Sequence, residues 1–172
     1  MALDPSIREA EPCEAVATAR VINEAYQVES FFKVGDRTTP REVAAFLVRE
    51  TFLIAIDLDE VLAGAVRVSA SGERGHFGML AVADSHRGTG LGARLVLAAE
   101  EWAANHGCTS MNLEVASPRT ELPPFYRKFG YELAGTAAWP PHALHELKRP
   151  AHFIVMSKTL RIPMRQEESV VS

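Results

Sequence analysis

The spacing of apolar residues in the first fifty positions predicts two helices. Over residues 14–26, the apolar side chains fall on one face of a helix with 3.6 residues per turn. A second helix is expected over residues 39–50, because Thr39 can cap the first turn and Pro40 fits the first helical position. Glu42 is expected to bond back to the capping amide. The loop between the helices, residues 31–38, carries two phenylalanines and three charged side chains.

Three strands are predicted in the middle of the chain, over residues 51–57, 61–69 and 76–83. The first and third are apolar along most of their length, which is typical of strands buried on both faces. Short polar turns separate the three segments. Such tight connections favour antiparallel pairing, because parallel strands need a long crossover.

The second half of the chain alternates helical and strand patterns. A long helix is predicted from about residue 87 to His106, with Gly107 in the position of a C-terminal cap. The strand over residues 109–115 then completes a strand–helix–strand unit, whose two strands are expected to be parallel. The remaining elements are a short helix over residues 122–129, a strand from Tyr131, a loop rich in Pro and His, and a last strand over 153–160.

This order of elements predicts an α/β (α+β) fold in a single domain over residues 1–161. The expected sheet is mixed and mostly antiparallel, with a central parallel strand pair and helices on both faces. Residues 162–172 have little apolar surface to pack and are expected to form a flexible tail.

Composition narrows the class of protein. The 172 residues carry 18 basic and 22 acidic side chains, and the net charge of −4 argues against nucleic-acid binding, which needs clustered positive charge. With 47% hydrophobic residues the chain can build a core, yet no run is long and apolar enough to cross a membrane. The first residues do not resemble a secretory signal, and two cysteines, Cys13 and Cys108, suit a reducing compartment. We therefore expect a cytoplasmic protein.

The strongest local signal is a glycine-rich turn between a buried strand and a helix. Gly88, Gly90 and Gly92 let backbone amides approach a ligand without a Cβ atom in the way. The following helix directs its unpaired amides and the positive end of its dipole to the same place, and Arg87 adds a charge. This pattern predicts a site for an anion, above all a pyrophosphate.

Three kinds of phosphate site are built on glycine-rich turns of this sort. A Walker A loop is excluded, because no Gly-Lys-Ser/Thr follows the glycines. A dinucleotide fold fits loosely, through Gly88-x-Gly90-x-x-Ala93 with Glu114 as the ribose-binding acid, but only one parallel crossover is visible. The third is a coenzyme A cradle.

The run Arg87-Gly88-Thr89-Gly90-Leu91-Gly92 resembles the Q/R-x-x-G-x-G/A signature of the GCN5-related N-acetyltransferases (GNAT). Leu80-Ala81-Val82 resembles the family's splayed fourth strand, and residues 125–131 (FYRKFGY) its second motif. Residues 153–158 resemble its last strand. The resemblance implies an acetyl-CoA-dependent N-acetyltransferase in which an amine attacks directly in a ternary complex. The residues it assigns to acetyl-CoA are Leu80, Ala81, Val82, Arg87, Gly88, Thr89, Gly90, Leu91, Gly92 and Ala93.

One position departs from the family pattern. Many members carry an asparagine seven positions before the tyrosine of the second motif, and here that position is Arg119. A contact between such an asparagine and the cofactor is therefore not transferred to this chain.

The resemblance also suggests catalytic residues. Tyr126 is the expected general acid, since a phenol can protonate a departing thiolate. Glu114 is placed slightly ahead of His76 and Glu73 as the general base. Deprotonation of the amine through a relay of water molecules is the alternative, and it would leave no motif in the sequence. Cys108 is expected to be a buried structural thiol rather than a nucleophile.

The acceptor is not identified by the sequence. The loops around residues 31–37 and 139–150 cover the acceptor site in the family, so Phe31, Phe32, Arg37 and Trp139 are candidate contacts, with core packing as an equal alternative. The His142-x-x-His145 pair lies in a Pro-rich loop without a third ligand, and no metal is expected.

The partner is therefore expected to be a small-molecule or peptide amine, with no nucleic acid or membrane involved. A homodimer is possible, because dimers are common in the family. The alternative functions are a non-catalytic acyl-CoA-binding regulatory module and, more distantly, an NAD-dependent oxidoreductase.

Overall fold

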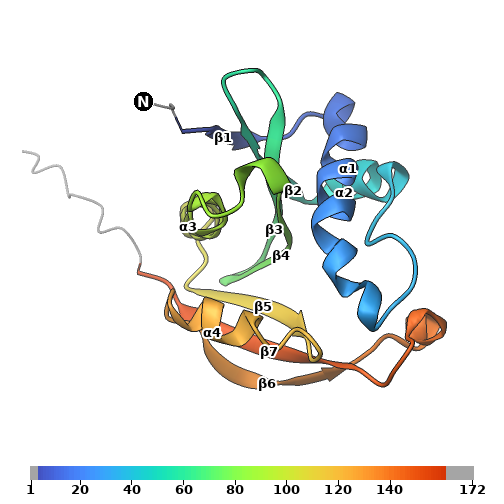
Figure 1. Cartoon of the computed structure of the whole chain (residues 1–172). Helices are drawn as coiled ribbons and strands as arrows, with labels where there is room; N and C mark the ends of the chain where they lie inside the picture. Colours follow the sequence, from blue (N-terminus) through green and yellow to red (C-terminus); the bar gives the residue numbers. More distant parts are fainter. Residues whose placement is uncertain (1–3, 162–172) are drawn as a thin grey trace, which may run out of the picture.

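The computed structural model describes residues 4–161, which build a seven-stranded sheet in the order β1-β2-β3-β4-β5-β7-β6 (Figure 1). Every neighbouring pair is antiparallel except β4 and β5. The strands are β1 (Ser6–Glu9), β2 (Thr51–Ile56), β3 (Leu62–Ser71), β4 (Arg74–Val82), β5 (Ser110–Ala116), β6 (Glu132–Ala138) and β7 (His152–Thr159).

Two hydrophobic cores lie on opposite faces of the sheet. One joins the sheet to α1 and α2, and the other joins it to α3 and α4. The predicted mixed sheet, its central parallel pair and the helices on both faces are thus confirmed. The helices are α1 (Ala15–Tyr26), α2 (Pro40–Arg49), α3 (Leu91–Asn105) and α4 (Leu122–Arg127), with short 3-10 turns η1 (Pro12–Glu14), η2 (Gln27–Phe31), η3 (Asp84–His86) and η4 (Pro141–Glu146).

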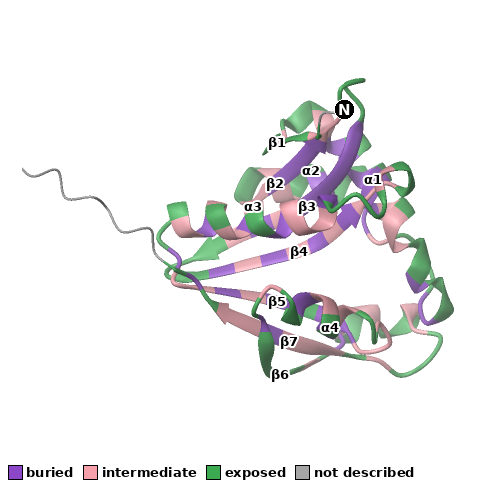
Figure 2. Ribbon diagram, turned by 60° about the vertical axis from the view of Figure 1, so that its left-hand side comes forward, coloured by how far each residue is buried: buried purple, intermediate pink, exposed green. Residues whose placement is uncertain are grey.

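The two parallel strands pair only at their beginnings. The register runs from Arg74–Ser110 to His76–Asn112, after which β4 remains paired with β3 and β5 with β7 (Figure 2). A β-bulge accompanies this divergence, because Met79 has a positive φ of 52° and the β3–β4 register shifts beside it. The last residues of β4 therefore have one free edge.

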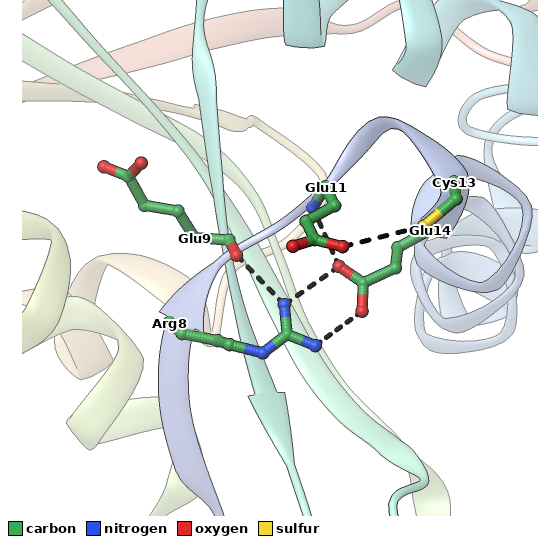
Figure 3. A network of polar contacts seen from close by, with 5 residues as sticks. All are labelled: Arg8, Glu9, Glu11, Cys13 and Glu14. Atoms are coloured by element: carbon green, nitrogen blue, oxygen red, sulfur yellow. Dashed lines mark hydrogen bonds and ion pairs between the residues drawn. The ribbon is translucent and has the colours of Figure 1, made fainter.

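Strand β1 was not predicted from the sequence. It is a short edge strand whose residues are mostly exposed, so it has no apolar alternation to reveal it. Its Arg8 donates hydrogen bonds to both carboxylate oxygens of Glu14, at 2.9 and 2.5 Å, and so ties the strand to the start of α1 (Figure 3). This hydrogen bonding lowers the pKa of Glu14 to about 2.

Two local details differ from expectation. Thr39 caps α2 as predicted, accepting a hydrogen bond from the Glu42 amide at 3.1 Å, but the Glu42 carboxylate accepts from the Thr38 hydroxyl and not from the capping amide. Helix α3 begins at Leu91, so the glycines at 88 and 90 precede it.

No helix within residues 4–161 is long and apolar enough to span a membrane. The tail expected over residues 162–172 lies outside the described residues.

Candidate active site

The glycine-rich turn follows the free end of β4 directly. Gly88 and Gly90 have φ values of 73° and 83°, in the left-handed region that favours glycine. A Cβ atom at either position would meet no protein atom within 4 Å, so the turn opens to solvent. Thr89 stabilises it from within, because its hydroxyl donates to the His86 carbonyl at 2.6 Å.

The turn and the first turn of α3 carry a row of unpaired amides. Within residues 4–161, the first hydrogen bond of this helix runs from the Arg94 amide to the Gly90 carbonyl, and no amide from Gly88 to Ala93 donates to a protein acceptor. Helix N-termini concentrate positive potential at such donors. This cradle has the donor set that a pyrophosphate requires.

Charged side chains surround the turn. Arg87 is more than half exposed and pairs with Asp84 at 3.0 Å, while His86 lies 3.5 Å from the carboxylate of Asp57. The Arg87 charge that the sequence assigned to the site is thus partly balanced by Asp84. The backbone amides are the principal unbalanced positive groups of the turn.

The free edge of β4 supplies further donors. The Ala83 amide donates to the Ala63 carbonyl on β3 at 2.8 Å. Successive amides of a strand point to opposite edges, so the amides of Val82 and Leu80 point to the edge that faces β5. Because β5 does not pair with β4 there, these amides are directed into the space between the two strands.

Helix α4 lies beside the start of α3. A Cβ atom at Gly92 would come within 4.0 Å of the Phe125 ring and 3.7 Å of Val82, so the end of β4, the cradle and α4 meet at this point. Tyr126 is the next residue of α4 and is 6% exposed. Its ring packs edge-on against Phe77 and Tyr131, with centroids 5.8 and 6.2 Å apart.

The Tyr126 hydroxyl makes no hydrogen bond within residues 4–161, but it keeps some contact with solvent, because it is not among the fully buried unpaired atoms. Burial, together with the nearby Tyr26 hydroxyl, raises the pKa of Tyr126 above that of a free phenol. The hydroxyl is thus free to contact a ligand and is protonated at neutral pH.

The three candidate bases fall in different places. His76 forms the last β4–β5 pair, with Asn112, and burial lowers its pKa, so it is neutral at pH 7. Glu114 is exposed and lies two residues farther along β5, on the sheet face opposite to α3. Glu73 lies in the β3–β4 turn, where its carbonyl accepts from the Thr109 amide, at the closed end of the strand pair. His76 and Glu114 therefore lie where the strands diverge, and Glu73 does not.

The two loops predicted to cover the acceptor are joined to each other. Lys33 and Leu147 form a β-bridge, and the Lys148 amide donates to the Phe32 carbonyl at 2.8 Å. Phe32 is fully buried and Trp139 is 9% exposed, and together with Ala116 they form a small separate core. For these two aromatic residues, the burial supports packing over acceptor contact.

Phe31 and Arg37 remain accessible in this region. The Phe31 ring is 44% exposed and lies under the Arg149 guanidinium. Arg37 lies over the Tyr26 ring, 5.4 Å from its centroid.

Arg119 fills the position of the missing asparagine and links two distant segments. Its guanidinium donates to Glu121 at 2.6 Å and to Glu29 of η2 at 3.1 Å. Burial raises the pKa of Glu29, although Arg119, Arg37 and Lys33 oppose this with their charges. Sequence reasoning missed Glu29, because no local pattern marks it. For Arg119 the sequence did contain a signal, because a charged residue stands at the position where many members of the family have an asparagine.

Cys108, His142 and His145 are candidates for nucleophilic or metal chemistry because of their residue types. Cys108 is 1% exposed, and burial raises the pKa of its thiol, as expected of a structural cysteine. His142 and His145 are exposed on η4. Within residues 4–161, no three His, Cys, Asp or Glu side chains are grouped closely enough to hold a metal ion.

Comparisons with known proteins identify the family of this chain and the fold that it shares. The sequence model described as "Acetyltransferase (GNAT) family" matches residues 19–131. A comparison with curated protein sequences gives no significant match.

Among solved structures, a GNAT-family acetyltransferase from Streptococcus pneumoniae is 23% identical, with 91% of this chain and 99% of that chain covered and a TM-score of 0.68. The ribosomal-protein-S18-alanine N-acetyltransferase of Escherichia coli is 16% identical, with 95% and 97% covered and a TM-score of 0.71. The yncA structure from Salmonella typhimurium, which contains its cofactor acetyl-CoA, is 17% identical, with 92% and 95% covered and a TM-score of 0.71. At these identities the structural likeness concerns the fold.

Proposed function

The chain belongs to the GNAT family of acetyltransferases, and on this basis we propose that it moves an acetyl group from acetyl-CoA to an amine by direct attack in a ternary complex. Acetyl-CoA is the acetyl donor of this family, and its thioester supplies an activated acetyl group. The observation that carries the proposal is the row of unpaired amides from Gly88 to Ala93, which follows the end of β4 that is not paired with β5.

These amides would hold the pyrophosphate, and three features fit that role. The cradle is open to solvent, the N-terminus of α3 favours negative charge, and Gly88 and Gly90 leave the space beside the backbone clear. The amides of Leu80 and Val82 would hold the pantetheine arm and polarise the thioester carbonyl. Arg87 would add a charge at the rim of the cradle.

Proton transfers are assigned to two side chains. Glu114 would take a proton from the attacking amine, directly or through water, and Tyr126 Oη would give one to the departing thiolate sulfur. The new bond joins the amine nitrogen to the acetyl carbon, and the carbon–sulfur bond breaks. The products are an amide and free coenzyme A thiol, so atoms and charge balance.

Binding and turnover test the proposal separately. We expect calorimetry to show binding of coenzyme A and acetyl-CoA but not of NAD, because the sheet has one parallel pair and no doubly wound crevice. Free thiol should appear when acetyl-CoA is supplied with an amine from a broad panel. No heat with either form of the coenzyme would overturn the proposal. Binding without turnover would instead identify a non-catalytic acyl-CoA module.

The Tyr126→Phe variant tests the general acid. It should lower kcat by about 100-fold, the lower range for general acid–base catalysis. The coenzyme A Kd should change little, because the Tyr126 hydroxyl holds no part of the cradle in place. Full activity of this variant would remove Tyr126 from the mechanism while leaving the cradle unaffected.

A further inference from the structure

A pocket of about 340 Å³ lies between the end of α1, η2 and the loop that follows it. Figure 1 shows η4, in orange, beside the lower end of the blue helical stretch that α1 and η2 form together, and Lys148 from the segment after η4 reaches the pocket wall. The residues that line it are Asn23, Tyr26, Gln27, Glu29, Ser30, Lys33, Val34, Gly35, Asp36, Arg37 and Lys148. The cradle and the catalytic candidates are not among them.

The lining carries more positive than negative charge. Lys33, Arg37 and Lys148 face two carboxylates, Glu29 and Asp36, which leaves a surplus of one positive charge. Glu29 is in addition paired with Arg119, which does not line the pocket. A positively charged pocket in a chain whose net charge is −4 is a local feature that the overall composition does not explain.

Two of these cations have no carboxylate at ion-pair distance in the described part of the chain. Lys33 as a whole is 7% exposed, but its ammonium group is not among the fully buried unpaired atoms and so reaches solvent; within residues 4–161 it has neither an ion pair nor a hydrogen bond. Arg37 likewise has no carboxylate at ion-pair distance, and its guanidinium is held over the Tyr26 ring. Both cations therefore reach the pocket without a carboxylate at bonding distance, and each can form a charge-assisted hydrogen bond with an anionic group of a ligand.

The pocket is connected by a direct contact to the segment that leads into α4. Arg119, which lies between the end of β5 and the start of α4, donates a hydrogen bond at 3.1 Å to Glu29 in the pocket wall. The pocket therefore lies on the side of the molecule from which β5 and α4 can be reached.

We propose that the acceptor carries a carboxylate besides its amine, as an amino acid does, and that Lys33 and Arg37 bind this carboxylate. A single negative charge matches the surplus in the lining, and Arg37 can form a two-pronged hydrogen bond with a carboxylate. Asn23, in the same pocket, uses its side chain to bond the Thr38 backbone at 2.9 and 3.0 Å, which holds the Arg37 segment against α1. The proposal rests on the acetyltransferase function and adds the class of acceptor.

The test compares amino acids with their carboxamides, which keep the amine and lose the negative charge. With acetyl-CoA saturating, at least one amino acid should have a kcat/KM about tenfold or more above that of its amide, the size expected for a charge-assisted hydrogen bond. Arg37→Gln and Lys33→Met should raise KM for that amino acid about tenfold with kcat nearly unchanged, and leave the amide unaffected. The matched control is Arg20→Gln, an exposed residue of α1 outside the pocket.

The outcomes separate this proposal from the function on which it rests. Equal use of amino acids and amides, or an unchanged KM in both pocket variants, would overturn the carboxylate site while the acetyltransferase stands. If no panel member is turned over, calorimetry on the coenzyme A-saturated protein decides. If an amino acid binds to the wild type and this binding is lost in Arg37→Gln, the carboxylate site is supported. If none of the amino acids binds, the carboxylate site is overturned. Failure to bind coenzyme A contradicts the proposed function itself, and the same amino-acid titration on the free protein still tests the pocket.

Discussion

At the scale of single residues, burial controls the chemistry of Tyr126. Its ring is enclosed by Phe77, Phe125 and Tyr131, while its hydroxyl has no protein partner among the described residues. Because the charged phenolate would be poorly solvated there, the pKa of Tyr126 is raised. A proton donor in this environment keeps its proton where a free phenol, with a pKa of about 10, would lose it.

The direction of this shift predicts the alkaline side of the pH–rate profile. The kcat/KM should rise with pH as the acceptor amine loses its proton, and it should stay level through pH ~10.5, because Tyr126 remains protonated there. Initial rates of thiol release between pH 6 and 10.5 would measure this. A decline centred near pH ~10 that is absent from Tyr126→Phe would contradict the raised pKa.

At the scale of elements, both ends of α3 depend on glycines in the left-handed conformation. Gly90 precedes the helix with φ 83°, and Gly107 follows it with φ 82°. A Cβ atom at either position would touch nothing within 4 Å. The two positions therefore share the same backbone requirement, and only Gly90 lies in the cradle.

This pair separates stability from ligand binding. Gly90→Ala and Gly107→Ala should each lower the free energy of unfolding by about 1 kcal/mol, because a left-handed L-residue is strained by roughly that amount. Only Gly90→Ala should weaken coenzyme A binding, since its methyl group projects where the pyrophosphate would lie. Urea unfolding and calorimetry measure the two effects. Equal coenzyme A affinity in both variants would contradict the placement of the cradle.

At the scale of the whole molecule, Arg119 joins parts of the chain that are 90 residues apart. It ties the segment between β5 and α4 to η2 at the open side of the diverging strands. Its side chain is 14% exposed and that of Glu29 is 9% exposed, so this pair is shielded from solvent, whereas Glu121 is 59% exposed. Removing Arg119 would leave the Glu29 carboxylate buried without its hydrogen-bonded partner.

We expect Arg119→Ala to lower the free energy of unfolding by about 1–3 kcal/mol, the penalty for an unsatisfied buried polar group. Glu121→Gln, the matched control, should cost less than about 1 kcal/mol, as exposed pairs do. The loss in Arg119→Ala should shrink as pH falls, because the pKa of Glu29 is already raised and protonation removes its buried charge. Urea unfolding at pH 7 and pH 5 measures both values, and equal losses in the two variants would show that Arg119 and Glu29 do not form a coupled pair.

The elements that sequence reasoning predicted are those whose signal is local. The cap at Thr39, the helix that follows the glycine-rich turn, the C-terminal glycine at 107 and the apolar run of β4 depend on neighbours a few positions away. The run was expected to be buried on both faces, whereas the side chains of β4 alternate between buried and partly exposed. Strand β1 was missed because an exposed edge strand carries no alternation, and its position depends on pairing with β2. The bulge at Met79 was missed because its positive φ occurs at a residue type that gives no warning of it.

The candidate site divides in the same way. The glycine turn and the helix that follows it could be predicted from the residues alone, because backbone freedom, capping and hydrophobic period are encoded over a few residues. The tyrosine motif was predicted only from the resemblance to the GNAT family. The divergence of β4 and β5 was expected from the family resemblance alone, and the register of the strands confirms it. The burial of Phe32 and Trp139, and the pocket that Lys33 and Arg37 line with Glu29, became visible in the three-dimensional arrangement. These properties depend on packing and charge contacts between segments far apart in the chain, which no short stretch of sequence contains.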